Sequence, residues 1–381
     1  MNPWQLRMIG MTHASLRGNR KKVNLALQGG GSHGAFTWGV LDFLLEDARL
    51  EIDAISGTSA GAMNAVALLE GMSTGGPQAA RKKLADLWRS VSNQSALSPI
   101  QRRFFDFFFG YGTPASALAY WGTDWLMHYG SPYEFNPFNI NPLLTFLRSS
   151  IDFEKVRAYD AIKLFVGATN VHTGKVKIFR RPDLTAEHVM ASACLPYFFQ
   201  AVVIDGEPYW DGGFMGNPPL FPLFYDSRVP DIVIVQVNPI ERNVTPRSAR
   251  EIQNRVNEIT YNGALLGELR AIDFVNRLID SGRLSQEQYM RPFVHRIDGG
   301  PFLDGFPAST KIDTTWSLIE RFFEHGRMAA EKWLDARFEA IGRESTLNLR
   351  MAYAETPHHG KARARLVLSG DGQEPQAANE P

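Results

Sequence analysis

In the first 70 residues, short apolar runs alternate with helical runs, and glycines stand at the junctions between them. Residues 23–28 and 52–56 have the length and the apolar character of buried strands. Apolar residues at helical spacing follow each strand, over 35–47 and 60–70. Two successive units of strand, glycine turn and helix predict a parallel α/β sheet. We expect further strands of this sheet at 162–170, 176–180, 202–204 and 232–237.

Changes in composition divide the chain into four parts: a polar leader at 1–22, the α/β domain at 23–240, a helical C-terminal extension at 241–345 and a tail at 354–381. Apolar spacing over 245–280 and 314–341 predicts two long helices in the extension, the second capped by Asp313. We expect the extension to pack on the sheet or to form a homodimer contact. The tail is rich in Gly, Pro and charged residues, a composition typical of disorder.

An aromatic-rich insert at 100–147 interrupts the α/β domain, after an amphipathic helix expected at 81–92. From Phe104 to Phe138, 35 residues carry 13 aromatic side chains and no Lys or Arg. The insert could form a lid or an acyl-chain pocket, or it could simply pack into the core. A third possibility is an edge that dips into a membrane interface, where Trp and Tyr are favoured.

The charge balance and the single cysteine exclude several classes of protein. The chain has 40 Lys and Arg residues against 40 Asp and Glu residues, which argues against a nucleic-acid partner. Cys194 has no second cysteine with which to form an intrachain disulfide or a multi-thiolate metal site, so we expect a buried, inert side chain. Neither a signal peptide nor a membrane span is recognisable, and we expect a cytoplasmic protein, with peripheral membrane contact as an option.

The first glycine-rich turn fits a dinucleotide-binding fingerprint. Gly29, Gly31 and Gly34 match G-x-G-x-x-G, and Asp53 follows 19 residues after Gly34. The match is imperfect because Asp53 is near the start of its strand, whereas the acidic residue should end it. Such a loop directs backbone N–H groups toward negative charge, which can be a pyrophosphate or a transition-state oxyanion. A tight turn without a ligand is the third interpretation.

The second turn, Gly57-Thr58-Ser59-Ala60-Gly61, has the G-x-S-x-G pattern of a nucleophile elbow between a strand and a helix. Small neighbours are required there because the serine backbone is strained. Ser59 is therefore the candidate nucleophile.

The base that activates Ser59 decides the class of enzyme. An α/β-hydrolase triad would use Asp211 with His295 or His325, in that chain order. That fold places several strands before its nucleophile, however, and only two fit before Ser59. Alternatively, Asp211 itself can serve as the base, since it precedes Gly212-Gly213 in a turn that would allow close approach. An ordinary Asp-Gly turn remains the alternative on local sequence.

Three motifs together resemble one known family. Residues 29–34 (GGGSHG), 55–62 (ISGTSAGA) and 211–213 (DGG) are similar to the oxyanion loop, the nucleophile elbow and the aspartate turn of the patatin-like phospholipases. Residues 167–174 (GATNVHTG) and 191–196 (ASACLP) also resemble the family. The resemblance covers about 23–240, and the C-terminal part is similar to an extension that a bacterial subset of the family carries.

The resemblance implies a three-layer α/β/α fold and a Ser59–Asp211 dyad that uses no histidine, metal or cofactor. It places an oxyanion hole at Gly29, Gly30, Gly31, Gly34 and Ala60, with the N–H groups of Gly30 and Gly31 as the main donors. Gly57, Gly61, Gly212 and Gly213 support the two motifs. His33 departs from the family pattern, in which Arg or Lys is frequent at this position. A neutral His33 leaves a preference for anionic head groups open, and packing at the helix start is its simpler role.

We therefore expect a lipid acyl hydrolase of the phospholipase A or lysophospholipase type that works through an acyl-enzyme intermediate. An esterase or thioesterase acting on other hydrophobic acyl esters, including polyester oligomers, would use the same chemistry. A nucleotide-binding protein and a catalytically silent lipid-binding module are the alternatives from other classes. The expected partners are a lipid or acyl-ester substrate, a transiently contacted membrane surface and a second copy of the chain.

Overall fold

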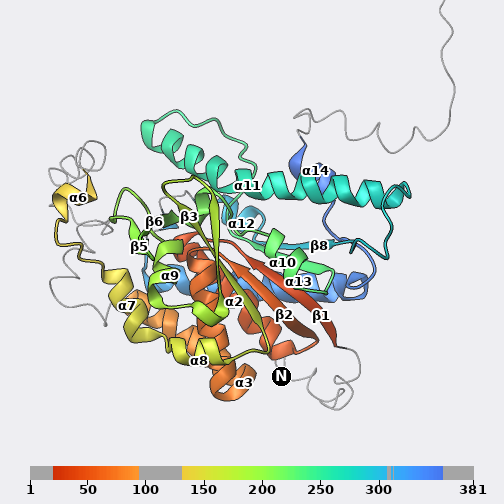
Figure 1. Cartoon of the computed structure of the whole chain (residues 1–381), viewed down its shortest axis with the longest axis horizontal. Helices are drawn as coiled ribbons and strands as arrows, with labels where there is room; N and C mark the ends of the chain where they lie inside the picture. The colour runs from red at the N-terminus through yellow and green to blue at the C-terminus, as the bar shows by residue number, and fades with distance from the viewer. Residues whose placement is uncertain (1–19, 94–130, 307–309, 312, 355–381) are drawn as a thin grey trace, which may run out of the picture.

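The computed structural model describes residues 20–93, 131–306, 310–311 and 313–354 (Figure 1). These residues form an eight-stranded sheet with the strand order β5-β6-β3-β2-β1-β7-β8, and β4 also pairs with β3. The strands are β1 (Lys21–Leu27), β2 (Leu50–Gly57), β3 (Lys163–Asn170), β4 (Val176–Arg180), β5 (Val202–Ile204), β6 (Glu207–Asp211), β7 (Asp231–Gln236) and β8 (Phe293–Asp298).

The centre of the sheet is parallel. β1 pairs in parallel with β2 on one side and with β7 on the other, and the parallel pairing continues to β3 and β8. β4, β5 and β6 form the antiparallel part. β1 and β7 are almost wholly buried, as expected for continuous apolar strands that are covered on both faces. Because β1 and β2 run parallel to each other, their carboxyl ends lie side by side at the same end of the sheet.

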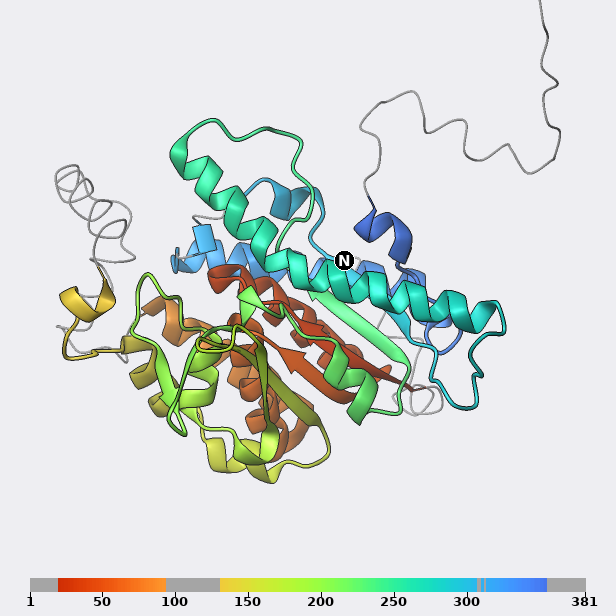
Figure 2. The same cartoon turned by 45° about the horizontal axis from the view of Figure 1, so that its top comes forward.

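Helices cover both faces of the sheet (Figures 1 and 2). The larger core cluster joins the sheet to α2 (Gly34–Asp47), α3 (Ala60–Asn93) and α13 (Trp316–Arg337), with Phe36, Leu68 and Phe322 fully buried. The smaller cluster joins the opposite face to α10 (Phe221–Asp226), α11 (Ala249–Asp280) and α14 (Leu349–Tyr353). The predicted three-layer α/β/α fold is confirmed.

Shorter helices complete the described chain. They are η3 (Gly31–His33), α6 (Pro132–Phe135), α7 (Pro142–Ser150), α8 (Phe153–Ala158), η5 (Arg181–Asp183), α9 (Ala186–Ser192), η6 (Gly212–Phe214), α12 (Pro301–Asp304) and η8 (Phe338–Ala340). The predicted insert at 100–147 lies mostly outside the described residues, as do most of the leader and nearly all of the tail.

The C-terminal part packs on the sheet and extends it. β8 pairs with β7, and α13 crosses α2 at very short range. A Cβ added to Gly39 would lie 2.0 Å from the Phe323 carbonyl oxygen, and one added to Gly326 would lie 2.1 Å from that of Phe36. Glycine at both positions therefore lets the two helix backbones touch. Each large apolar side chain that α13 buries in this way contributes about 1.5–3 kcal/mol.

Several elements differ from the sequence-based expectation. β6 and β8 were not predicted. The two helices expected at 60–70 and 81–92 are present as the two parts of α3, separated by non-helical backbone at Gly75 and Gly76. The N-terminal cap of α13 is Thr315 rather than Asp313. The Asp313 carboxylate instead accepts hydrogen bonds from the backbone N–H and the hydroxyl of Thr315.

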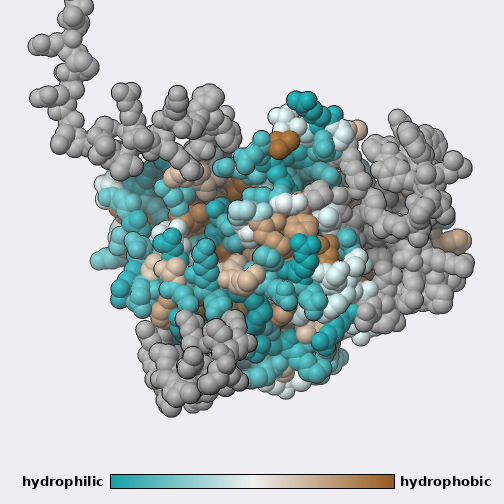
Figure 3. Space-filling model, turned by 180° about the vertical axis from the view of Figure 1, so that it is seen from behind, coloured by the Kyte–Doolittle hydropathy of each residue, from teal (hydrophilic) through white to brown (hydrophobic). Residues whose placement is uncertain are grey.

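Seen from behind, the described surface is mostly polar, with small apolar patches between the polar side chains (Figure 3). None of the helices in the described ranges combines the length and the apolar character needed to cross a bilayer.

Candidate active site

Ser59 stands at the sharp turn between β2 and α3. Its φ angle is +52°, in the left-handed region that serine rarely adopts, as a nucleophile elbow requires. A Cβ added to Gly61 would lie 2.2 Å from the carbonyl oxygen of Leu27 in β1, so the turn is pressed against the neighbouring strand. The Ser59 N–H donates to Ser192 Oγ at 2.9 Å, and the Ser192 hydroxyl donates to the Gly167 carbonyl at 2.6 Å. Hydrogen bonds thus connect the elbow to α9 and, through the Ser192 hydroxyl, to β3.

The glycine loop lies directly beside the elbow because Leu27 of β1 pairs with Gly57 of β2. The Gly29 N–H donates to Asn217 Oδ1 at 2.6 Å, and the Gly34 N–H donates to carbonyls of η3. These two donors are therefore engaged within the protein. Within the described part of the chain, the N–H groups of Gly30, Gly31 and Ala60 donate to no other protein group. These three N–H groups of the glycine loop and the elbow are therefore available to an outside acceptor.

The register of the sheet brings Asp211 to the elbow. Phe165 and Val166 pair with both β2 and β4, so β2 and β4 lie on opposite edges of β3. Ala168 and Thr169 pair with both β4 and β6, so β6 lies on the same edge as β2. β6 therefore continues the line of β2 along β3. Asp211, the last residue of β6, follows the end of β2 and lies where the elbow begins.

The Asp211 carboxyl is 4% exposed and is held by the turn that follows it. Its Oδ1 accepts a hydrogen bond from the Gly213 N–H at 2.6 Å, and its backbone N–H donates to the Cys194 carbonyl at 2.8 Å. Burial raises the pKa of Asp211 to about 7, while hydrogen bonds from Gly213 and from the Ser59 side chain partly oppose this rise. A carboxyl with a pKa near neutrality, hydrogen-bonded to a serine hydroxyl, is suited to accept that proton.

The two histidines that could complete a triad are engaged elsewhere. His295 is fully buried in β8, and its ring nitrogens lie 3.0 Å from Asp231 at the start of β7 and 3.0 Å from Thr346. Because β7 runs parallel to β1 and β2, its start lies at the end of the sheet opposite to Ser59. The ring of His325 stacks on Phe302.

His33 packs at the start of α2, which is the simpler of the two roles considered for it. It is 1% exposed, its ring lies against Phe322, and its Nε2 is 2.7 Å from Thr310 Oγ1. Burial, together with the charge of nearby Lys311, lowers the pKa of His33 to about 3. His33 is therefore a neutral residue of the loop.

Two other expectations concern Asp53 and Cys194. The Asp53 carboxylate binds Lys163 at 2.9 Å and Ser227 at 2.8 Å, and it lies on β2 four residues before the strand ends. It is therefore distant from the glycine loop and unavailable to a ribose there. Cys194 is buried and donates to the Gln200 carbonyl, and burial raises the pKa of its thiol to about 12, so it is inert.

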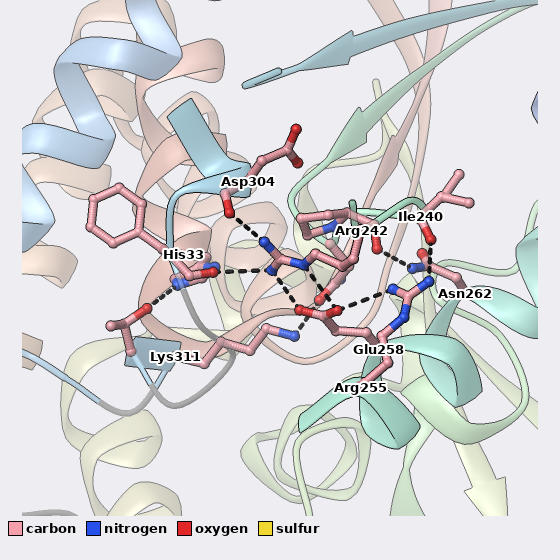
Figure 4. Close-up of polar contacts among 12 residues, drawn as sticks. His33, Ile240, Arg242, Arg255, Glu258, Asn262, Asp304 and Lys311 are labelled. Carbon is pink, nitrogen blue, oxygen red and sulfur yellow. Dashed lines mark hydrogen bonds and ion pairs between the residues drawn. The ribbon is translucent and has the colours of Figure 1, made fainter. Parts of the chain in front are cut away.

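A polar network behind the glycine loop was not predicted. Asn238 Nδ2 donates to the Gly29 carbonyl at 2.7 Å, and Lys311 Nζ donates to Asn238 Oδ1 at 2.5 Å. Arg242 joins the Glu258 carboxylate to backbone carbonyls of Asp304 and Phe306 (Figure 4). No local motif marks these residues, because they come from three separate segments that only the fold brings together.

The fold and the site together define an α/β protein with a strained serine elbow, a glycine loop and a buried aspartate at one edge of a sheet. The sequence model of the family described as Patatin-like phospholipase matches residues 25–224, which is more than half of the chain. The chain belongs to the patatin-like phospholipase family, which implies a hydrolase that acts on esters.

Solved structures that match the chain include those of two bacterial proteins. VipD from Legionella pneumophila is 16% identical with a TM-score of 0.41, and the alignment covers 86% of this chain and 69% of VipD. ExoU from Pseudomonas aeruginosa, in its complex with SpcU, is 15% identical with a TM-score of 0.29, and the alignment covers 82% of this chain. It covers 53% of that structure, so the chain spans about half of the length of ExoU. No curated protein matches the chain.

Proposed function

We propose that this protein hydrolyses acyl esters of lipids, in the phospholipase A or lysophospholipase class, with Ser59 as nucleophile and Asp211 as general base. The observation that carries the proposal is the strained elbow that presents Ser59 to the buried Asp211 carboxyl, whose pKa burial raises to about 7. Backbone strain and a perturbed pKa both cluster at functional sites, so a left-handed serine next to a carboxyl of raised pKa indicates a catalytic role.

In the first half of the reaction, Asp211 takes the hydroxyl proton of Ser59 as Oγ bonds to the ester carbonyl carbon. The N–H groups of Gly30, Gly31 and Ala60 hold the resulting oxyanion, and the loss of one such donor lowers the rate by about 100- to 1,000-fold. The tetrahedral intermediate then collapses, the alcohol leaves with the proton from Asp211, and the acyl group remains on Ser59.

In the second half, Asp211 takes a proton from water while the water oxygen attacks the acyl carbonyl carbon. The second tetrahedral intermediate expels Ser59 Oγ, which regains its proton, and the free fatty acid is released. The same two residues thus serve both steps, and no step needs a metal or a histidine.

The surroundings of Asp211 favour an apolar acyl group. Met215 is 42% exposed on the segment after the aspartate turn, and Tyr197 is 56% exposed on the loop after Cys194, which holds the Asp211 backbone. Phe214 packs edge-on against Tyr261 next to the turn. Apolar side chains on both flanks of the base suit a hydrocarbon chain and transient contact with a lipid surface.

The test is a panel of substrates offered to the purified protein: phospholipids, lysophospholipids, short-chain aryl esters, acyl thioesters and polyester oligomers. We expect fatty-acid release from the lipids by wild type and by the surface control Ser285→Ala, and none by Ser59→Ala. Turnover confined to thioesters or polyester oligomers would instead identify an esterase or thioesterase of the same chemistry. Equal turnover by Ser59→Ala would refute the proposed nucleophile.

A further inference from the structure

Lys311 lies between α12 and α13, 280 residues after the glycine loop in sequence, yet it touches that loop. A Cβ added to Gly31 would lie 2.1 Å from the Lys311 carbonyl oxygen, so the two backbones are in direct contact. Gly31 has a φ of +57°, and glycine is required there for both reasons. The preceding residue, Thr310, contacts His33 Nε2 at 2.7 Å. The segment therefore covers the loop that carries the proposed oxyanion donors.

The side chain of Lys311 holds the loop from a second direction. Its Nζ donates to Asn238 Oδ1 at 2.5 Å, and the Asn238 amide donates to the Gly29 carbonyl at 2.7 Å. Asn238 also donates to Gln28 Oε1 at 3.1 Å, at the point where β1 ends. A single chain of hydrogen bonds thus runs from the ammonium to the first glycine of the loop.

The ammonium also belongs to the electrostatic environment of the dyad. The groups that face it are Asp211 from β6, Glu258 and Tyr261 from α11, Arg242 from the segment after β7, and neutral His33 from η3. Figure 4 shows the Lys311 side chain extending toward Glu258 and Arg242. Burial lowers the pKa of Lys311 to about 8, while the attraction of Glu258 raises it. The side chain is therefore mostly charged at pH 7, and its charge lowers the pKa of Asp211.

We propose that Lys311 is a positioning residue of the active site, which fixes the oxyanion loop through Asn238 and biases Asp211 toward the carboxylate form by its charge. The proposal rests on the proposed function, since it assigns a role toward the proposed base and oxyanion donors. It also gives the C-terminal part a place in catalysis, because the α/β domain at 23–240 does not include Lys311. An Asn238–lysine contact that served packing alone would not influence the titration of Asp211.

The consequence for pH dependence has two parts. In wild type, kcat/KM rises as Asp211 loses its proton near pH 7, and it falls as Lys311 loses its proton above about pH 8. In Lys311→Met the alkaline decline disappears, because the titrating cation is gone. The acid limb moves to higher pH, because removal of a nearby positive charge disfavours the carboxylate.

The experiment measures kcat and kcat/KM for a short-chain aryl ester from pH 5 to 10 in wild type, Lys311→Met and Lys311→Arg. Lys332→Met, on the exposed side of α13, is the control with the same change in net charge. We expect kcat of Lys311→Met to fall about 10- to 100-fold because the glycine loop is misplaced. We also expect both the acid and the alkaline limb of its pH profile to change. Lys311→Arg should restore the acid limb, and Lys332→Met should match wild type.

Carboxyl ¹³C NMR of aspartate-labelled protein measures the pKa of Asp211 directly, with Asp211→Asn supplying the assignment. An Asp211 pKa that is the same in wild type and Lys311→Met overturns the proposal, as does an unaltered pH profile. If Lys311→Met does not fold, Lys311→Gln removes the charge while keeping a donor for Asn238 and is judged by the same criteria. A wild type without turnover would refute the proposed function alone, because the NMR comparison would still decide the role of Lys311.

Discussion

Replacement of Asp211 by asparagine should make the protein more stable while it destroys turnover. Asparagine has nearly the same shape, and its amide oxygen can still accept the hydrogen bond from the Gly213 N–H. It lacks the charge that burial opposes, and it cannot take the proton of Ser59. The side chain that the reaction needs is therefore one that weakens the fold at working pH.

The size of this effect follows from the raised pKa of Asp211. With a pKa near 3.8 in the unfolded chain and about 7 in the folded protein, ionisation of this carboxyl lowers the free energy of unfolding by about 4 kcal/mol. The sign is that of a group which binds its proton more tightly when folded. Its contribution is fully present below pH 4 and is lost as the pH rises through 7. Above pH 7, Asp211→Asn should exceed wild type by about this amount, relative to their difference at pH 4.

Urea unfolding followed by circular dichroism between pH 4 and 9 measures this difference. The control is Asp53→Asn, because the partners of Asp53 lower the pKa of its carboxyl, although its burial acts in the opposite direction. Removal of that carboxylate should make the variant less stable than wild type as the pH rises, the opposite trend. If the stability difference between Asp211→Asn and wild type does not change with pH, the inference that the buried Asp211 carboxyl retains its proton in the folded protein is wrong.

Four further substitutions test the surroundings of the dyad and the absence of a catalytic histidine. Ser192→Ala removes the acceptor of the Ser59 N–H, and we expect kcat to fall about 10- to 100-fold with a smaller change in KM, measured by steady-state kinetics. Gly61→Ala places a Cβ 2.2 Å from a backbone carbonyl oxygen of β1, so the midpoint of urea unfolding should fall by the equivalent of about 1–3 kcal/mol or more. His295→Ala and His325→Ala should retain turnover once corrected for the folded fraction, and loss of activity in a folded variant would argue for a histidine-dependent mechanism.

The part of the site that could be predicted is the part encoded in short segments. The elbow at Ser59 and the glycine loop are each contiguous, and each follows a strand whose apolar pattern is unmistakable. Their adjacency follows from the parallel pairing of the first two strands. Chain order and the glycine turn make Asp211 a candidate base, but only the resemblance decides for it, since an Asp-Gly turn alone is a common surface feature.

The elements that were missed have weak or conflicting local signals. β6 is five residues long, contains Pro208 and ends in the aspartate turn, so it reads as part of a loop. β8 includes His295, Arg296 and Asp298, and it lies between two long helical stretches. Its strand character comes from pairing with β7 at the edge of the sheet. Tertiary pairing, rather than local propensity, decides both strands.

The groups that support the site are even less visible in the sequence. Lys311 and Asn238 act on the glycine loop from segments far apart in the chain, and nothing in their neighbours distinguishes them from surface residues. Ser192 lies within a stretch that resembles the family, but its bond to the Ser59 N–H emerges only from the packing of α9 on β3. Such contacts depend on three-dimensional register, which periodicity does not encode.

The measurement that tests the central claim most directly is the site of reaction with a fluorophosphonate, read by intact mass and peptide mapping. We expect a single adduct on Ser59 in wild type, no adduct in Ser59→Ala, and much slower labelling in Asp211→Asn. An adduct on another residue, or labelling of Asp211→Asn at the wild-type rate, would contradict the Ser59–Asp211 dyad.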